Sequence, residues 1–342
     1  MSLIKYKQAL ESVLTGQDLS HADMLSMMQQ IMQGELTPAQ IAGFLIGLRI
    51  KGESVDEITA AATVMRALST KVNIVDKTHL IDTCGTGGDG IQTFNVSTVS
   101  AFVAAAAGAK VAKHGGRSVS STCGSADVLE SLGVNVNLTP EQVADCVNHI
   151  GIGFMFAPNH HSAMKHSAPV RRELGVRTLF NLLGPLTNPA NAKCQVVGVF
   201  KQELTLKLAK VLQNLGSEHV LVVHGADGLD EISFTGDTYV AELKNGQISQ
   251  FKVNPTQFGL GLHDLKSIQV QSADESKAMI LAVLNAEKDG KKNAARDIVL
   301  MNAGAAIYVA GLADNLQTGI ETAALAIDSG QALAKLEALR SV

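Results

Sequence analysis

Hydrophobic positions in the first 70 residues recur at the spacing of α-helices. Apolar side chains fall on one helical face at Met24, Leu25, Met28, Ile31 and Met32. Three helix starts are marked by a hydroxyl residue three positions before an acid or an amide: Ser20 with Asp23, Thr37 with Gln40, and Ser54 with Glu57. We therefore predict an all-helical domain over residues 1–71, in which the methionines fill the core.

From about residue 72 the pattern changes to short apolar runs that alternate with helical segments. The predicted strands are 80–83, 109–112, 152–156, 194–200 and 219–223, and the predicted helices between them are 97–107, 126–131, 140–148 and 203–215. This alternation favours a parallel sheet covered on both faces. Asn245-Gly246, between two further apolar runs, indicates an antiparallel hairpin. The predicted fold class is α/β: a small all-helical N-terminal domain and a larger α/β domain, 72–342, with a mainly parallel central sheet flanked by helices.

Composition and charge exclude several classes of function. The formal net charge is −4 and no basic face is evident, which argues against a nucleic-acid partner. Four cysteines without a C-x-x-C pair suggest neither a zinc site nor a disulfide scaffold. The first residues lack the apolar run of a signal peptide, and the longest apolar stretch, around 101–109, is too short to span a membrane. We expect a cytoplasmic protein without a membrane partner.

The stretch from Asp82 to Gly90 contains four glycines within six residues, directly after an apolar run. Gly85, Gly87 and Gly90 match the G-x-G-x-x-G pattern of dinucleotide-binding loops. That pattern requires an acid about 20 residues later, and no Asp or Glu occurs between Asp89 and Asp127. A Walker loop also fails, because its Lys and Ser/Thr are missing. A tight turn would need fewer glycines, so we favour contact between this backbone and a different phosphate-containing ligand.

Two further polar segments follow predicted strands or precede predicted helices. The segment 93–98 places small polar groups at a helix N-terminus, where Asn95 or Ser97 could cap the helix and where free amides also favour anions. The segment 113–121 combines Lys113 and Arg117 with two glycines and several hydroxyls. It is either a solvated basic loop or part of a polyanion site. Gly124-Ser125 adds one hydroxyl and one amide at the next helix start.

Acids and histidines could in principle hold a metal ion. Residues 227–231, Asp-Gly-Leu-Asp-Glu, are either solvated or part of a Mg²⁺ site, because Mg²⁺ prefers one or two carboxylates together with substrate oxygens. The spacing of His160, His161 and His166 is not that of a helical zinc pair, so packing or contact with an acceptor is favoured for them.

Six motifs together resemble, in order, those of the anthranilate phosphoribosyltransferase family. They are GTGGD from Gly85, NVST from Asn95, KHGGRSVSS from Lys113, the segment 169–171, NLLGPLTNP from Asn181 and DGLDE from Asp227. The resemblance covers essentially the whole chain. It implies Mg²⁺-dependent transfer of the 5-phosphoribosyl group from 5-phosphoribosyl 1-diphosphate (PRPP) to the amino group of anthranilate, releasing pyrophosphate in tryptophan biosynthesis. It also implies a homodimer formed through the helical domain, to which residues of about 160–190 would return.

The same resemblance implies which residues form the site. Those implied for PRPP are Gly85, Gly88, Asp89, Thr93, Asn95, Val96, Ser97, Thr98, Lys113, Ser121 and Ser125. Those implied for anthranilate are Gly85, His114, Gly116 and Arg171, of which His114 and Arg171 are candidates for positioning the acceptor. Those implied for Mg²⁺ are Ser97, Asp230 and Glu231. No residue is predicted to act as a covalent nucleophile.

One position departs from the family pattern, and two alternatives remain open. The family usually has Asn after Lys-His-Gly, where this chain has Gly116, which affects the acceptor half of the site. A pyrimidine nucleoside phosphorylase has a similar Lys-His-Gly segment, but the DGLDE acids and the GTGGD and NVST pair argue against it. A catalytically silent relative that binds nucleic acid should show a basic surface, whereas this chain is acidic.

Overall fold

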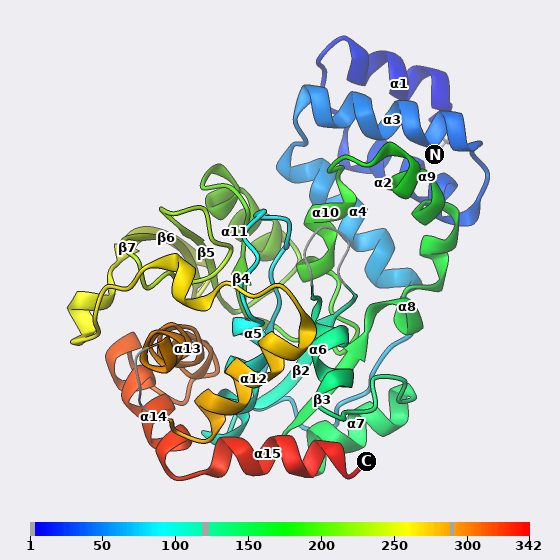
Figure 1. Cartoon of the computed structure of the whole chain (residues 1–342). Coiled ribbons are helices and arrows are strands. Elements are labelled where there is room, and N and C mark those ends of the chain that lie inside the picture. The colour runs from blue at the N-terminus through cyan, green and yellow to red at the C-terminus, as the bar shows by residue number, and fades with distance from the viewer. Residues whose placement is uncertain (1–3, 118–122, 288–290) are drawn as a thin grey trace.

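The computed structural model describes residues 4–117, 123–287 and 291–342. Four helices open the described chain: α1 (Tyr6–Leu14), α2 (His21–Gln33), α3 (Pro38–Lys51) and α4 (Val55–Leu68). The hydroxyls of Ser20, Thr37 and Ser54 accept backbone N–H groups at the starts of α2, α3 and α4, which confirms the three predicted caps. Helix α1 carries no such sequence signal, because its N-cap residue is Lys5. These helices form a bundle apart from the sheet (Figure 1).

The second part of the chain is built on one seven-stranded sheet with the order β3-β2-β1-β4-β5-β6-β7. The strands are β1 (Leu80–Thr83), β2 (Lys110–Gly115), β3 (Ile152–Phe156), β4 (Cys194–Gly198), β5 (His219–Gly225), β6 (Thr238–Lys244) and β7 (Gln247–Val253). Strands β3, β2, β1, β4 and β5 pair in parallel, and β6 and β7 add the predicted antiparallel hairpin. The predicted fold class is therefore confirmed.

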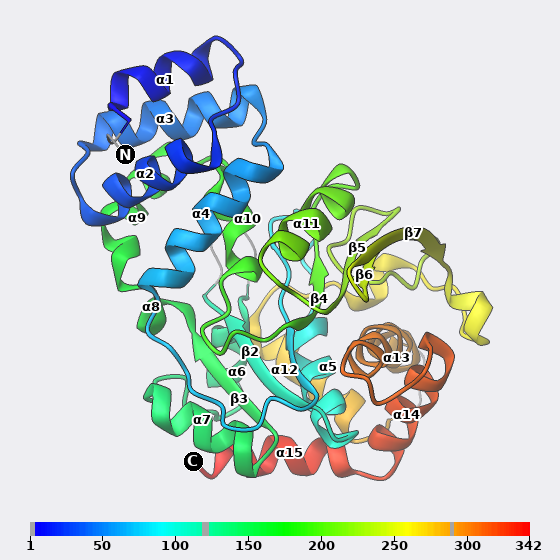
Figure 2. The same ribbon diagram turned by 180° about the vertical axis from the view of Figure 1, so that it is seen from behind.

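Helices cover both faces of this sheet (Figure 2). The α-helices that follow β1 are α5 (Val96–Ala106), α6 (Ser125–Ser131), α7 (Pro140–His149), α8 (Ala157–His160), α9 (Ala168–Leu174), α10 (Phe180–Leu183), α11 (Glu203–Asn214), α12 (Ala273–Leu284), α13 (Lys291–Val309), α14 (Leu316–Asp328) and α15 (Gln331–Arg340). Short 3₁₀ helices are η1 (Ser162–His166), η2 (Gly184–Leu186), η3 (Pro255–Phe258) and η4 (Leu265–Ile268). Strand β4 is shorter than predicted and ends at Gly198, where the backbone of Asp230 crosses against it.

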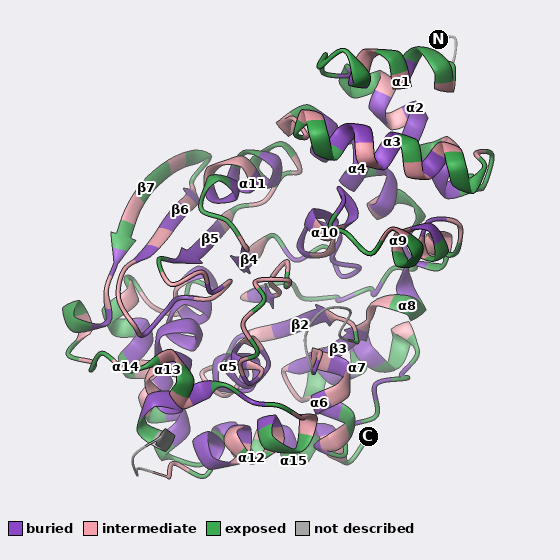
Figure 3. Ribbon diagram, turned by 45° about the horizontal axis from the view of Figure 1, so that its top comes forward, coloured by how far each residue is buried: buried purple, intermediate pink, exposed green. Residues whose placement is uncertain are grey.

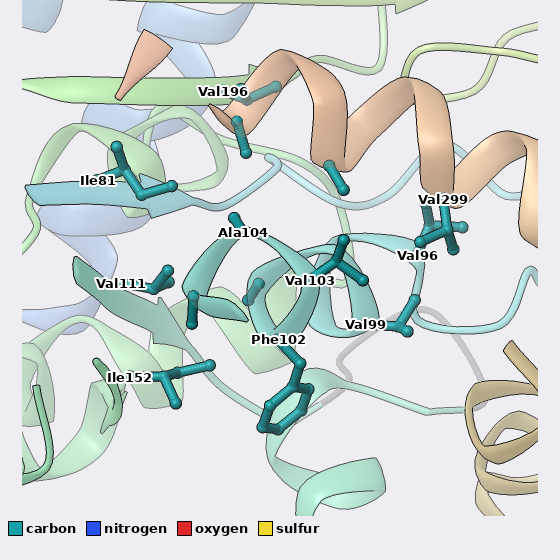
Figure 4. Packing of buried hydrophobic residues seen from close by; sticks show 14 of the residues in the cluster. Ile81, Val96, Val99, Phe102, Val103, Ala104, Val111, Ile152, Val196 and Val299 are labelled. Carbon is teal, nitrogen blue, oxygen red and sulfur yellow. The ribbon is translucent and has the colours of Figure 1, made fainter. Parts of the chain in front are cut away.

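The main core lies around α5, which is buried along nearly its whole length. Figure 4 shows Val99, Phe102 and Val103 of α5 beside Val111 and Ile152 of the sheet. A helix that is apolar on all sides must be covered on all sides, and α13, α14 and α15 pack around α5. The N-terminus of α5 is consequently held at one fixed place at the carboxyl end of β1.

A second core joins the helical bundle to the opposite face of the sheet. Apolar side chains of α2, α3 and α4 belong to the same buried cluster as Leu183 of α10 and Val197 of β4. The segment between β3 and β4 lies against the bundle, since η1 contacts α2, α9 contacts α3 and α10 contacts α4. Figure 3 shows the buried strands at the centre and exposed positions along the edge strand β7. The bundle and the sheet therefore meet next to the carboxyl ends of β1, β2 and β4.

Candidate active site

A cavity of about 340 Å³ opens at the carboxyl ends of β1 and β2. Ligand sites in α/β proteins form at this end of the strands. The predicted residues that line the cavity are Gly85, Gly88, Asp89, Thr93, Asn95, Val96, Ser97, Lys113, His114, Gly116, Ser125, Arg171, Asp230 and Glu231. Thr98 is buried on the inner side of α5 and does not line it. Ser121 lies outside the described residues, so its contact stays a prediction.

The glycine-rich loop brings bare backbone to the cavity. Gly87, Gly88 and Gly90 have φ angles of 61°, 75° and 80°, which side chains other than glycine rarely adopt. Gly85 is constrained differently, because an added Cβ would lie 2.7 Å from Oδ2 of Asp230. The N–H of Gly87 donates to the same oxygen at 2.8 Å. Glycine thus suits the turn at three positions and allows close approach to Asp230 at the fourth.

A buried ammonium group faces the start of α5. The Nζ of Lys113, on β2, donates to the carbonyl oxygen of Thr83 and, at 3.2 Å, to Oγ of Ser97. Lys113 is only 3% exposed, yet its side chain reaches the cavity wall. A positive charge, a hydroxyl and the free N–H groups of a helix N-terminus therefore converge at one place, which suits an anion.

Two of the neighbouring polar groups have structural partners. The side-chain amide of Asn95 donates to the carbonyl of Cys123 at 3.1 Å, and its oxygen accepts from Ser276 at 2.7 Å. Asn95 occupies the N-cap position of α5 without a capping side-chain bond, so the predicted cap is only positional. Arg117 pairs with Asp127 and Glu130 at 2.9 and 2.5 Å. The charge of Arg117 is therefore neutralised by these two carboxylates.

Three carboxylates form the acidic wall of the cavity. Oε1 of Glu231 accepts the N–H of Ser97 at 3.2 Å, which places it beside the hydroxyl that Lys113 contacts. Burial, followed by repulsion from Asp89, raises the pKa of Asp230 to about 7. Burial, followed by repulsion from Asp230, raises the pKa of Glu231 to about 8. Like charges held this close disfavour ionisation unless a cation is added.

The first acid of the same segment has a different role. Asp227 accepts hydrogen bonds from the hydroxyls of Ser233 and Thr235 at 2.6 and 2.7 Å and from the N–H of Leu229 at 3.1 Å. These bonds shape the loop after β5 and aim Asp227 away from the cavity, whose lining does not include it.

Among the described residues no cluster of three or more His, Cys, Asp or Glu side chains has the arrangement of a metal site.

A second cavity of about 580 Å³ adjoins the first on the side of the helical bundle. Its wall is mainly apolar, with Met65, Phe156, Met164, Phe180 and Leu183 among its members. The two cavities share His114, Gly116 and Arg171. The guanidinium of Arg171 stacks 5.3 Å from the ring centre of Phe180, and burial lowers the pKa of Arg171. This cavity suits an aromatic molecule that carries one negative group.

A pair of neutral histidines lies at the junction of the cavities. The Nε2 atoms of His114 and His161 are 3.2 Å apart, so one ring donates and the other accepts. Burial, which is the larger cause, and the neighbouring histidines lower the pKa of His114 to about 3 and that of His161 to about 4. His160 instead contacts the carbonyl of Thr70 at 3.0 Å. His160 and His161 therefore contact groups of the chain itself, a backbone carbonyl and another imidazole.

Sequence reasoning missed the support beneath His114. The buried carboxylate of Asp82 accepts the backbone N–H of His114 at 3.1 Å and an N–H of Asn188 at 2.7 Å. Asn188 also donates to the carbonyl of Ala112 at 2.9 Å. Burial raises the pKa of Asp82 to about 6, while the bond from Asn188 opposes that rise. The NLLGPLTNP motif contains Asn188 and could have drawn attention to it. The sequence does not show that Asp82, 106 residues away, is its partner.

Comparison with known proteins bears on this geometry. The model of the glycosyl transferase family α/β domain matches residues 77–333, and that of the glycosyl transferase family helical bundle domain matches residues 7–69. The anthranilate phosphoribosyltransferase of Methylobacillus flagellatus is 62% identical over 336 residues, which cover 98% of this chain and 97% of the relative. This chain belongs to the anthranilate phosphoribosyltransferase family.

Two solved structures of the anthranilate phosphoribosyltransferase family share the whole architecture. The enzyme from Thermus thermophilus superposes with a TM-score of 0.91 at 40% identity, covering 97% of this chain and 98% of the other. The Saccharomyces cerevisiae enzyme, in complex with PRPP and Mg, superposes with a TM-score of 0.86 at 30% identity, covering 97% of this chain and 96% of the other.

Within the part of this chain that the structure describes, no helix has the length and apolar character needed to cross a membrane.

Proposed function

We propose that this chain is a Mg²⁺-dependent anthranilate phosphoribosyltransferase, which moves the 5-phosphoribosyl group of PRPP to the amino group of anthranilate and releases pyrophosphate. One observation carries the proposal. A polar cavity with a glycine loop, a buried ammonium and paired acids shares lining residues with an apolar cavity, and the half-buried guanidinium of Arg171 belongs to the lining of both. The two substrates require these two environments next to each other, because the reaction joins a polyanionic sugar to a flat aromatic amine.

The donor side favours departure of the diphosphate. As the bond from ribose C1 to pyrophosphate breaks, negative charge builds on the leaving group and positive charge on the sugar. The glycine-loop amides, the N-terminus of α5 and Lys113 are already fixed in place by Asp230, Thr83 and Ser97. Donors that need no reorganisation stabilise developing charge most effectively.

We assign Mg²⁺ to Ser97, Asp230 and Glu231. The fit rests on two half-buried carboxylates whose pKa values are raised, first by burial and then by repulsion from the neighbouring acids, so that an added cation would favour their charged forms. When bound with PRPP, Mg²⁺ neutralises charge on the diphosphate. Two backbone bonds hold the carboxylates beside the donor site. The N–H of Gly87 donates to Asp230, and the N–H of Ser97 donates to Glu231.

The acceptor side orients the amine. Arg171 is proposed to bind the carboxylate of anthranilate, and the aromatic ring would lie against the apolar wall near Phe180. The aromatic amine is uncharged at neutral pH and reacts directly, so proximity to C1 is the main requirement. Because His114 and His161 are neutral, they offer hydrogen bonds without adding positive charge beside the developing positive charge of the sugar.

The domain division and the assembly are also proposals. We assign residues 1–71, with about 160–190, to one domain and the rest of the chain to the other. Leu14 at the end of α1 and Ile50 at the end of α3 are 62% and 80% exposed, which supports a homodimer formed through the helical part. The four cysteines are free, which is typical of a reducing cytoplasm, the compartment we propose.

The experiment follows the fluorescence of anthranilate with purified protein, with and without PRPP and Mg²⁺. Loss of fluorescence that needs both, with equimolar release of pyrophosphate, is the expected result. The meta isomer of anthranilate serves as a control, because its carboxylate cannot reach Arg171 while the amine stays at C1. If fluorescence is not lost although calorimetry shows that PRPP binds, the assignment of anthranilate as the acceptor is refuted. The assignment of PRPP as the donor would then stand.

A further inference from the structure

Arg177 connects the helical bundle to the glycine loop. It lies in the turn between α9 and α10, the segment that runs between the bundle and the sheet (Figure 1). Its Nη2 donates to the carbonyl oxygen of Gly88, and its guanidinium stacks 4.3 Å from the ring centre of Phe200, which follows β4. Its own carbonyl oxygen accepts from Nη1 of Arg49, on α3, at 2.6 Å. One residue therefore contacts three separate parts of the fold.

We propose that Arg177 is a positioning residue that fixes the donor loop for the diphosphate and ties the loop to the position of the helical bundle. This inference rests on the proposed function and adds a role to a residue that does not line the donor cavity. Arg177 acts through Gly88 and touches no reacting atom.

The peptide between Gly88 and Asp89 shows how the contact works. The C=O and N–H of a trans peptide point in opposite directions, and the described chain has no cis peptide. With the carbonyl of Gly88 held by Arg177, the N–H of Asp89 faces the other side of the loop. Gly88 and Asp89 both line the cavity. The contact therefore selects the peptide orientation that offers an N–H to an anion.

Two side chains from distant parts of the chain hold the middle of the loop. The N–H of Gly87 is held by Asp230, and the carbonyl of Gly88 is held by Arg177. At such a glycine-rich turn, the backbone has many alternatives to this arrangement. The positive charge of Arg177 also lies near Asp89 and opposes the rise in the pKa of Asp89 that burial causes. Loss of Arg177 would leave the loop held by Asp230 and, at its start, by the bond from the N–H of Thr86 to the carbonyl of Gly198 at 2.8 Å.

The contact can respond to movement of the bundle. A cavity of about 230 Å³ lies beside Arg177, between α3 and the start of α11, with Arg49, Glu53, Phe200 and Lys207 in its wall. Beside this cavity, α3 and the turn after it are linked to the rest of the chain by the bonds from Arg49 to the carbonyl of Arg177 and from Lys207 to the carbonyl of Glu53. Movement of α3 would reach the loop through Arg49 and Arg177.

The test compares binding of the two substrates in variants of the full chain. Arg177→Ala is expected to weaken PRPP binding about five- to tenfold, measured by calorimetry with Mg²⁺, because an exposed side chain contributes about as much as one ordinary hydrogen bond. The KM for anthranilate should stay within about twofold, as for a surface change remote from the acceptor. Arg177→Lys keeps the charge but not the planar fork, and should recover part of the loss.

A second variant, Arg49→Ala, keeps the proposal testable if Arg177→Ala fails to fold. Arg49→Ala should weaken PRPP binding in the same direction, and the double variant should bind no more weakly than Arg177→Ala alone, because both act through one contact. Arg172→Ala is the matched control, since Arg172 is an exposed arginine of the same segment. Unchanged PRPP binding in Arg177→Ala, an equal loss for both substrates, or multiplying effects of the two variants would overturn the proposal. Each variant is compared with wild-type protein whose transferase activity is measured first, so failure of this proposal is distinguishable from failure of the proposed function.

Discussion

Replacing the acidic pair by amides is expected to stabilise the ligand-free protein increasingly as pH rises, while it removes the response to Mg²⁺. In the wild type, burial and then repulsion between carboxylates raise the pKa of Asp230 to about 7 and that of Glu231 to about 8. Each carboxylate accepts one backbone bond, Asp230 from Gly87 and Glu231 from Ser97. Asn and Gln oxygens can accept the same bonds. The variant Asp230→Asn with Glu231→Gln therefore removes charge and keeps the acceptors.

The sign and size follow from proton linkage. A carboxyl whose pKa is raised on folding binds more protons in the folded protein, so the wild-type free energy of unfolding falls as pH rises from about 4 to about 8. One pKa unit corresponds to about 1.4 kcal/mol, which sets an upper limit of about 4 kcal/mol for Asp230 alone. Both side chains are partly exposed and their titrations are coupled. We expect about 2 kcal/mol for the pair between pH 5 and pH 8.

The assay is urea unfolding without Mg²⁺ across that pH range, followed by circular dichroism. The stability of the variant relative to the wild type should grow with pH, whatever constant offset the substitution adds. Calorimetry with Mg²⁺ and pyrophosphate should show binding to the wild type and none to the variant. Asp227→Asn, a carboxylate-to-amide change in the same segment but outside the cavity, should keep the Mg²⁺ response. A difference in stability that is constant with pH, or that shrinks as pH rises, would refute the reasoning.

Three further predictions concern the acceptor side and the frame of the site. Arg171→Ala should raise the KM for anthranilate more than that for PRPP, and an equal rise in both would argue against its role. Gly116→Asn should fold normally, because an added Cβ meets only Ala157 at 4.0 Å, and should lower the KM for anthranilate; an unchanged KM would show that the departure at this position is neutral. Gly198→Ala should destabilise the protein by about 1–3 kcal/mol in urea unfolding and weaken Mg²⁺ binding. Its Cβ would overlap the backbone oxygen of Asp230, and wild-type stability would contradict this.

Features with partners close in sequence could be predicted from the sequence. The caps at Ser20, Thr37 and Ser54 each join atoms three residues apart, so the local sequence contains both members of the pair. The apolar run that became β3 was recognisable because strands buried on both faces are nearly continuously hydrophobic. The glycine-rich stretch was recognisable as well, since its φ angles admit few other residues.

Features whose partners lie far apart in sequence were decided by the tertiary structure. Nothing in the segment 227–231 distinguishes Asp227, which binds its own loop, from Asp230, which meets the glycine loop 143 residues away. The contact of His161 with His114 spans 47 residues, and that of Arg177 with Gly88 spans 89. Such pairs form only after the core around α5 and the core of the helical bundle fix where each segment runs. The sequence by itself determined which residue types the site contains, because local patterns specify the elements that carry them. Packing decided which of these residues face the cavity and which support it, because that depends on the relative placement of elements that no local pattern encodes.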